Sequence, residues 1–193
     1  MKFTLLKADA RTRNEFIRPH GVWTVLKSVF IRGHPWFSLP HMAHIHEKID
    51  FTVAIFVVHD GKVLLIHHRK LNKWLPLGGH IELDEDPEQA ALREAREESG
   101  FDVELLGERP PTTEPGTRAL IGPRFLDIHR ISDTHEHIGM IYWARPKGGT
   151  LALAEAEHHD IRWCAPDELE KLDPPMTSAV KWYCLKAIEE VSR

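Results

Sequence analysis

The stretch GHIELDEDPEQAALREAREESGF, residues 79–101, decides the fold of this chain. Asp86 is a favoured N-cap, and Pro87 suits the first helical position because its missing N–H would be unpaired there anyway. Gln89 stands three residues after Asp86, which is the spacing of a capping box. Gly100 suits the left-handed residue that ends many helices. The stretch therefore predicts a glycine-containing loop followed by a helix that begins at Pro87 and ends before Gly100.

Three acidic side chains of this helix gather on one side. Glu94, Glu97 and Glu98 are three and four residues apart, so they project from the same face of an α-helix. Like charges at this spacing destabilise an isolated helix by roughly 0.2–0.5 kcal/mol per pair, and a hard divalent cation is a natural partner to neutralise them. Arg93 lies one turn before Glu97 and can pair with it or with Glu85, which would hold the carboxylates in place.

The spacing of residues 79–101 resembles the Nudix box, the signature of the Nudix hydrolases. That pattern is a glycine, five residues, a glutamate, seven residues and then Arg-Glu-aliphatic-any-Glu-Glu-any-Gly-aliphatic. Its fixed positions are occupied here by Gly79, Glu85, Arg93, Glu94, Glu97, Glu98 and Gly100. Ala95 and Phe101 are mild departures, because a small and an aromatic residue stand at the aliphatic positions. Residues 75–80 and 127–131 also resemble a bacterial Nudix subgroup whose substrate is not generally assigned.

The resemblance implies a metal-dependent hydrolase. Nudix enzymes cleave a nucleoside diphosphate linked to another moiety, and water attacks the phosphorus. Carboxylates and pyrophosphate oxygens are both hard ligands, so Mg²⁺ or Mn²⁺ is the implied cofactor and a nucleotide-type small molecule is the implied substrate. By resemblance, Glu97 and Glu98 bind the metal and Glu94 binds it or takes the proton of the water. The carbonyl of Gly79 or of Gly78 would complete the shell.

The resemblance also implies residues that support or complete this site. Arg93 and Glu85 would orient the metal ligands from a second shell. Many Nudix proteins add an acid from a loop after the box, and EHHDIRW at residues 157–163 resembles the acidic run before a tryptophan strand in relatives. Glu157 is therefore expected to complete the metal site. The alternatives are Glu155 and Glu136.

The identity of the substrate is poorly encoded. His80, in the loop of the box, is expected either to hydrogen-bond a phosphate oxygen or to cap the loop. Trp74 is a candidate for stacking on a base, as are Trp143 and Trp36, although buried tryptophans more often belong to a core. Pro115 lies near the place of a proline in ADP-ribose-cleaving relatives, but this loop is crowded with prolines. The sequence does not choose among nucleotide substrates.

Apolar and β-branched runs predict a sheet around the box helix. Strands are expected at 51–58, 62–69, 102–106, about 124–131 and about 137–145, and a short strand ends at Trp163 and Cys164. Further helices are expected at 165–172 and 177–191. This order of elements is α/β and resembles the Nudix fold, an α/β/α sandwich with a mixed central sheet, over roughly residues 50–190.

The first part of the chain lies outside the resemblance. Residues 1–48 are expected to be an N-terminal extension, and residues 49–193 the Nudix domain. Residues 1–49 carry eight Lys/Arg and three acids, which is a net charge of +5. The whole chain has a net charge of −4, so residues 50–193 carry a net charge of −9. The sequence does not decide whether the extension is a solvated segment, a small subdomain, a lid or a dimer arm. It also does not decide whether translation starts at Met42.

Composition argues against several classes of protein. No apolar run reaches the roughly 18 residues of a membrane span, and the N-terminus is charged too early for a signal peptide. The two cysteines, Cys164 and Cys184, form no CxxC motif and no disulfide framework, which suits a reducing compartment. We therefore expect a cytoplasmic enzyme with no membrane partner and no DNA-binding module. Whether it forms a homodimer is open.

The fourteen histidines raise the question of a metal site. Several lie close together in sequence, namely His41, His44, His46 and the pairs His67/His68, His135/His137 and His158/His159. A zinc site needs three or four convergent ligands, and adjacent histidines of a strand point to opposite faces. No cysteine partner lies nearby. The sequence alone therefore predicts no dedicated zinc site.

Two other functions are compatible with the fold that the resemblance implies. One is a Nudix module that senses a nucleotide without cleaving it, and the intact set Glu94, Glu97 and Glu98 argues against this function. The other is an isoprenoid-diphosphate isomerase, whose chemistry needs a catalytic cysteine. Cys164 lies outside any motif that resembles the isomerase family's. Hydrolysis is therefore the function that the sequence favours.

Overall fold

The computed structural model describes residues 48–111 and 114–192. The predicted extension lies outside this range except for Lys48, and so do Trp36, Met42 and the three histidines between residues 41 and 46. The division at residues 48 and 49 therefore stays a prediction. Among the described residues, no helix is both long enough and apolar enough to cross a membrane.

The described residues form eight strands, two α-helices and one short 3₁₀ helix. The strands are β1 (Ile49–His59), β2 (Lys62–His68), β3 (Lys73–Leu75), β4 (Leu77–His80), β5 (Phe101–Leu106), β6 (Phe125–Ser132), β7 (His135–Gly149) and β8 (His158–Cys164). The helices are α1 (Pro87–Ser99), the 3₁₀ helix η1 (Leu169–Lys171) and α2 (Ser178–Val191).

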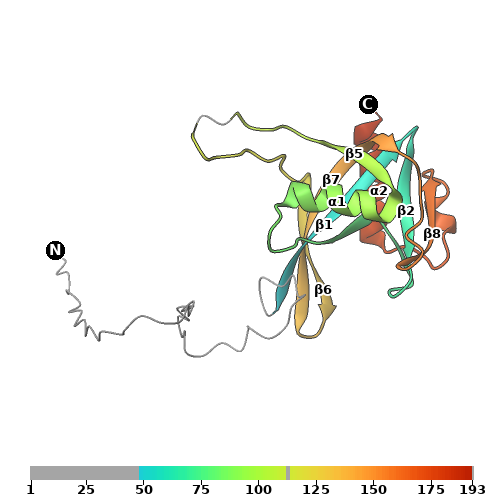
Figure 1. The fold of residues 1–193 in the computed structure, drawn as a ribbon. Helices are drawn as coiled ribbons and strands as arrows, with labels where there is room; N and C mark the ends of the chain where they lie inside the picture. The colour runs from blue at the N-terminus through green and yellow to red at the C-terminus, as the bar shows by residue number, and fades with distance from the viewer. Residues whose placement is uncertain (1–47, 112–113, 193) are drawn as a thin grey trace, which may run out of the picture. The chain divides into compact units, whose positions relative to one another are not determined.

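Strand β1 is the centre of a mixed sheet. It pairs in parallel with β7, in antiparallel fashion with β4, and at its end with β2. Strands β5 and β6 pair with β7, whereas β3 and β8 pair with β2. The β6–β7 hairpin and the start of β1 extend together beyond the rest of the sheet (Figure 1). One end of the sheet is therefore built from only a few strands.

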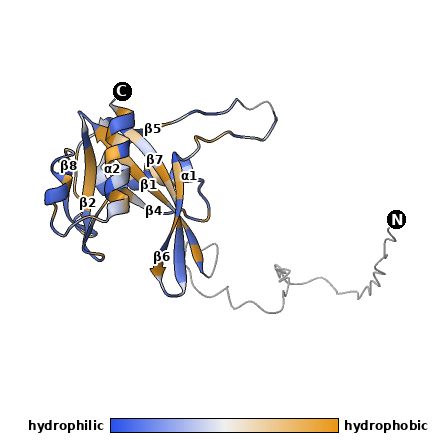
Figure 2. Ribbon diagram, turned by 180° about the vertical axis from the view of Figure 1, so that it is seen from behind, coloured by the Kyte–Doolittle hydropathy of each residue, from blue (hydrophilic) through white to orange (hydrophobic). Residues whose placement is uncertain are grey.

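The two α-helices cover opposite faces of this sheet (Figure 1). Val53, Ile55 and Val57 of β1 belong to the core that contains the alanines of α1, whereas Phe56 and Val58 belong to the core under α2. A strand that is buried on both faces has an almost continuous apolar sequence, and β1 is such a strand. Strand β2 is also mostly hydrophobic (Figure 2). The predicted α/β/α arrangement with a mixed sheet is confirmed.

Helix α1 begins and ends where local sequence signals predict. The Asp86 carboxylate accepts hydrogen bonds from the N–H groups of Glu88 and Gln89, and the Gln89 side chain accepts one from the Asp86 N–H at 2.9 Å. Gly100 has φ +74°, the left-handed conformation that suits glycine. The capping box and the glycine cap are therefore confirmed.

The structure differs from the sequence prediction at short elements. The helix expected at 165–172 is only the 3₁₀ helix η1, preceded by a turn at residues 166–168. Strands β3 and β4 were not predicted, because they are three and four residues long and β4 contains Gly78 and Gly79. Pairing with β1 and β2 makes these residues strands despite their low local preference.

Candidate active site

Helix α1 turns two of its predicted acids toward strand β4. The N–H of Gly78 donates a hydrogen bond of 2.7 Å to Oε2 of Glu98, a side chain that is almost fully buried. A Cβ atom at Gly79 would collide with the carboxylate of Glu94, so a residue without a side chain makes room for that carboxylate. Glu97 points outward, with 61% of its side chain exposed. Gly78 and Gly79 of β4 thus position Glu98 and Glu94, but not Glu97.

Arg93 holds three carboxylates and a backbone carbonyl. Its guanidinium donates to Oε1 of Glu85 at 2.6 Å and to Oε2 of Glu85 at 3.1 Å. Its Nη1 donates to Glu94 at 2.8 Å and to Glu97 at 3.0 Å, and its Nη2 donates to the His80 carbonyl at 3.1 Å. The sequence left open whether Arg93 pairs with Glu97 or with Glu85, and the structure contains both pairs. A planar group with several donors can bind all of these acceptors at once.

The carboxylates of Glu94 and Glu98 are strongly perturbed by their surroundings. Burial raises the pKa of Glu94 to about 7, against the opposing effect of Arg93, and the charges of Glu98 and Glu97 add to the rise. Burial also raises the pKa of Glu98, although contacts with His158 and with the Gly78 N–H oppose this. Two buried carboxylates side by side are costly without a nearby cation. Such perturbation is typical of functional sites.

Of the three acids proposed outside the box, Glu157 is the one that meets Glu98. Donor atoms of Glu98, Glu157 and His158 all lie within 4.8 Å of one another. The main chain at this turn is held by Arg69, whose N–H donates to the Glu157 carbonyl at 2.8 Å. Glu136, by contrast, lies at the start of β7 in the extended β6–β7 hairpin. Glu94, Glu97, Glu98 and Glu157 are called the carboxylate cluster below.

His158 is a site residue that the sequence did not single out. It is fully buried, and its Nε2 lies 3.0 Å from Oε1 of Glu98. The pair His158/His159 was not predicted to bind metal, because neighbouring strand residues point to opposite faces. The two side chains do point to opposite faces, since His158 is buried and His159 is exposed. One histidine of such a pair can still face a site. Its position next to Glu157 was the signal available in the sequence.

The two predicted substrate-binding residues lie elsewhere. The His80 Nε2 atom is 3.4 Å from Oδ2 of Asp50, and the ring packs against His137. Since successive strand residues face opposite ways, His80 projects from the face of the sheet opposite to that of Gly79. Trp74 is only 3% exposed, and its Nε1 donates to the Asp173 carbonyl at 3.0 Å. Its burial does not support the prediction that it stacks on a base, and it is a core residue.

Gly78→Ala is expected to lower the free energy of unfolding by about 2–4 kcal/mol. Gly78 has φ +149°, a conformation that other residues adopt at a cost of about 1–3 kcal/mol, and a Cβ atom there would also collide with the carbonyl of Val53 in β1. Gly79→Ala is the matched control, because its Cβ would meet only the end of the Glu94 side chain, which can rotate away. Urea denaturation of both variants measures the difference. Equal losses would contradict this account of β4.

Comparison with known proteins agrees with the geometry. Residues 48–183 match the NUDIX domain family. The chain is 31% identical over 127 residues to the CTP pyrophosphohydrolase of Escherichia coli (strain K12), covering 63% of this chain and 79% of that protein. It is 28% identical over 137 residues to a MutT-like protein of Streptomyces ambofaciens, covering 70% and 77% of the two.

A solved structure supports the same assignment. The crystal structure of a NUDIX-family hydrolase from Clostridium perfringens superimposes with a TM-score of 0.64 at 30% sequence identity, covering 74% of this chain and 97% of that one. Both the domain match and this fold include the strands and the helix that carry the carboxylate cluster. The chain therefore belongs to the Nudix hydrolase family.

Proposed function

We propose that this protein is a metal-dependent nucleotide pyrophosphohydrolase. It cleaves the diphosphate linkage of a nucleoside diphosphate joined to another moiety, by attack of water on phosphorus. The observation that carries the proposal is the meeting of Glu98 with the loop acid Glu157, while Glu94 of the same helix approaches Gly79 of β4. Helix α1 and the turn before β8, which are far apart in sequence, thus supply carboxylates to the same region.

The residues of this site fit a hard divalent cation. Carboxylate oxygens from Glu94, Glu98 and Glu157 are the ligands that Mg²⁺ and Mn²⁺ prefer, whereas the His158 nitrogen is a softer donor. Burial raises the pKa values of Glu94 and Glu98, and a bound cation would favour their charged forms. When bound, the ion would neutralise charge on the phosphate oxygens and acidify the attacking water. His158 is assigned to orienting Glu98, which it approaches to 3.0 Å.

The other residues position these carboxylates and move the proton. Glu94 is assigned either to bind the metal or to accept the proton of the attacking water, and burial makes it a stronger base than a free carboxylate. Arg93 and Glu85 form the ion pair that sets the position of Glu94 and of the exposed Glu97. The Arg93 bond to the His80 carbonyl ties the loop of the box to the helix. A displacement of about 1 Å in such a site can cost roughly a hundredfold in rate.

In the metal-free protein, Glu94→Gln is expected to raise stability at about pH 8 but not at about pH 4.5. The folded protein holds the Glu94 proton more tightly than the unfolded chain, so stability is lost as the pH rises from about 4.5 to about 7. The loss is on the order of 3 kcal/mol, and a neutral glutamine avoids it. Denaturation in EDTA across this range measures the difference between variant and wild type. Glu104→Gln, at an exposed position of β5, is the control, and a difference for Glu94→Gln that does not change with pH would contradict the assignment.

The substrate class is tested by a panel of nucleotides. CTP comes first, since the Escherichia coli relative is named a CTP pyrophosphohydrolase. Other nucleoside triphosphates, 8-oxo-dGTP, ADP-ribose, NADH and dinucleoside polyphosphates follow, each with Mg²⁺ or Mn²⁺ and with chromatographic separation of the products. The proposal predicts a nucleoside monophosphate and the phosphorylated remainder from at least one of them. Binding of a nucleotide without turnover of any would favour a sensing module instead.

The cysteines argue against an isoprenoid-diphosphate isomerase. Cys164 of β8 and Cys184 of α2 are both buried, at 1% and 0% exposure, in the core between α2 and the sheet. Burial raises the pKa of Cys164 to about 11 and raises that of Cys184 further. Neither thiol is therefore ionised or accessible at neutral pH, as a catalytic cysteine would need to be.

A further inference from the structure

Strand pairing gathers histidines of distant sequence position on one face of the sheet. His137 of β7 lies opposite His129 of β6 and beside Asp50 of β1. His135 lies two residues before His137, so its side chain is on the same face. His80 of β4 is paired with Thr52, which lies two residues after Asp50 and shares its face. Four strands thus direct titratable side chains to a single place.

The side chains at this place are in contact with one another. The Nε2 atoms of His135 and His80 are 3.0 Å and 3.4 Å from Oδ2 of Asp50. The His137 ring centre lies 4.9 Å from that of His80 and 5.2 Å from that of His135. Asp50, His135 and His137 each offer one metal-ligating atom, and these three atoms lie within 4.8 Å of one another. We call these three residues the Asp–His cluster.

The Asp–His cluster is separate from the carboxylate cluster. Gly79 faces α1 and the Glu94 carboxylate, whereas the next residue, His80, faces the Asp–His cluster from the other side of the same strand. None of the three cluster residues belongs to the Nudix box. The two clusters also differ in chemistry, since one offers oxygens and the other mostly imidazole nitrogens.

We propose that Asp50, His135 and His137 form a binding site for a divalent transition-metal ion of the Zn²⁺ type. Two imidazoles and one carboxylate are a recurrent set for such ions, with a position left for water or a further ligand. Donor atoms bound at about 2.0–2.2 Å in a tetrahedral site lie about 3.3–3.6 Å apart, so small side-chain rotations would close this group on an ion. His80 is placed to supply a fourth ligand. Mg²⁺ prefers oxygens and would compete weakly here.

The surroundings of the Asp–His cluster suit a positive ion. Asp50 is fully buried, and buried carboxylates in proteins are paired or bind a metal. Burial, together with the neighbouring His80, His129 and His135, lowers the pKa of His137 to about 4, against the opposing effect of Asp50. A neutral imidazole is the form that coordinates a metal. The Asp–His cluster therefore joins one fully buried acid to two imidazoles within reach of it.

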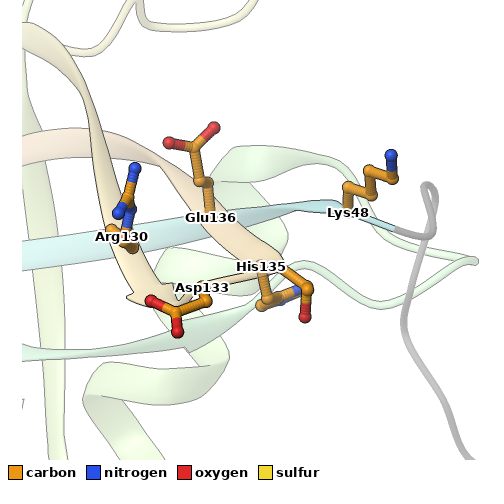
Figure 3. A pocket seen from close by; sticks show the side chains of 6 residues that line it. Lys48, Arg130, Asp133, His135 and Glu136 are labelled. Carbon is orange, nitrogen blue, oxygen red and sulfur yellow. The ribbon is translucent and has the colours of Figure 1, made fainter.

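One residue of the Asp–His cluster borders a hollow at the end of the sheet. His135 lines a hollow of about 290 Å³ together with Lys48, Arg130, Asp133, Thr134 and Glu136 (Figure 3). In this view the His135 and Asp133 side chains lie on one side of the hairpin, and those of Glu136 and Lys48 lie on the other. His80 is also partly open to solvent, at 43% exposure. The site therefore combines buried and accessible ligands.

The test is metal binding by the full-length protein, and it does not depend on hydrolysis. The protein is stripped of metal, saturated with Mg²⁺ to fill the carboxylate cluster, and titrated with Zn²⁺ by calorimetry and with Co²⁺ by visible absorption. His135→Gln and His137→Gln should each weaken the tightest site more than about a hundredfold, beyond the roughly 10–100-fold effect of losing an outer-shell partner. Asp50→Asn, which keeps the shape of the side chain, is an independent variant. His159→Gln, an exposed histidine of β8, is the matched control and should bind as the wild type does.

Thermal melting separates loss of a ligand from loss of the fold. Zn²⁺ should raise the melting temperature of the wild type and of His159→Gln, but not that of His135→Gln or Asp50→Asn. Without metal, His135→Gln loses its 3.0 Å contact with the buried Asp50, so the zinc-induced shift of each variant is measured from that variant's own metal-free melting temperature. The proposal is overturned if the wild type binds neither ion in the presence of Mg²⁺, or if all three cluster variants keep wild-type affinity.

Discussion

Glu98→Gln is expected to lower kcat/KM by at least about three orders of magnitude, which corresponds to roughly 4 kcal/mol of lost transition-state stabilisation. Glutamine keeps the shape of the side chain and an oxygen that can accept the Gly78 hydrogen bond, but it removes the charge that would bind the metal. Because burial raises the pKa of Glu98, a neutral residue is also expected to be tolerated by the fold. The effect should therefore fall on activity and not on stability.

Steady-state kinetics with the best substrate, together with thermal melting, measures both quantities. Glu104→Gln makes the same chemical change at an exposed position of β5 and should leave kcat/KM unchanged. A Glu98→Gln variant with near-normal kcat would show that Glu98 is not a ligand in the hydrolytic site. A variant that loses activity only because it has unfolded would be recognised by its melting curve.

Removal of divalent metal is expected to abolish hydrolysis. Glu98 and Glu157 then present carboxylates close to one another, Glu94 adds a third from the same side of α1, and a phosphate-bearing substrate would add further negative charge. EDTA followed by metal-free buffer should stop turnover, and Mg²⁺ or Mn²⁺ should restore it. Product formation is followed before chelation, after chelation and after each ion is returned.

Zn²⁺ is the informative comparison for this experiment. It should fill the Asp–His cluster without restoring the activity that Mg²⁺ restores, because the two sites use different ligands. Full turnover of the best substrate after rigorous metal removal would contradict the metal-dependent mechanism. Zn²⁺ could instead restore hydrolysis by itself, at one equivalent of Zn²⁺ per protein. That result would show that the Asp–His cluster and the hydrolytic site are not independent.

Much of the candidate active site could be predicted from the sequence because its determinants are local. The α-helical period places Glu94 and Glu98 on one side of α1, and Asp86, Gln89 and Gly100 define the ends of the helix through bonds to near neighbours. The pairing of Arg93 with Glu97 also follows from a separation of one turn. Glu157 was chosen by resemblance, and the structure brings it to Glu98.

Other features depend on contacts between strands that are far apart in sequence. Strands β3 and β4 are too short to be recognised by pattern, and pairing with β1 and β2 creates them. Sequence also does not distinguish an exposed indole from one that is 3% exposed, as Trp74 is, and its burial does not support the prediction that it binds a base.

The sequence by itself determined the box helix, its caps, the family and the chemistry that three glutamates imply. Only the tertiary structure decided which histidines meet. Asp50, His80 and His137 stand on β1, β4 and β7, and the register of these strands sets which side chains share a face. Helical periodicity is a property of neighbouring residues, whereas strand register is set by the packing of the whole sheet. For that reason the histidine spacing alone predicted no zinc site, and the folded chain presents a candidate for one.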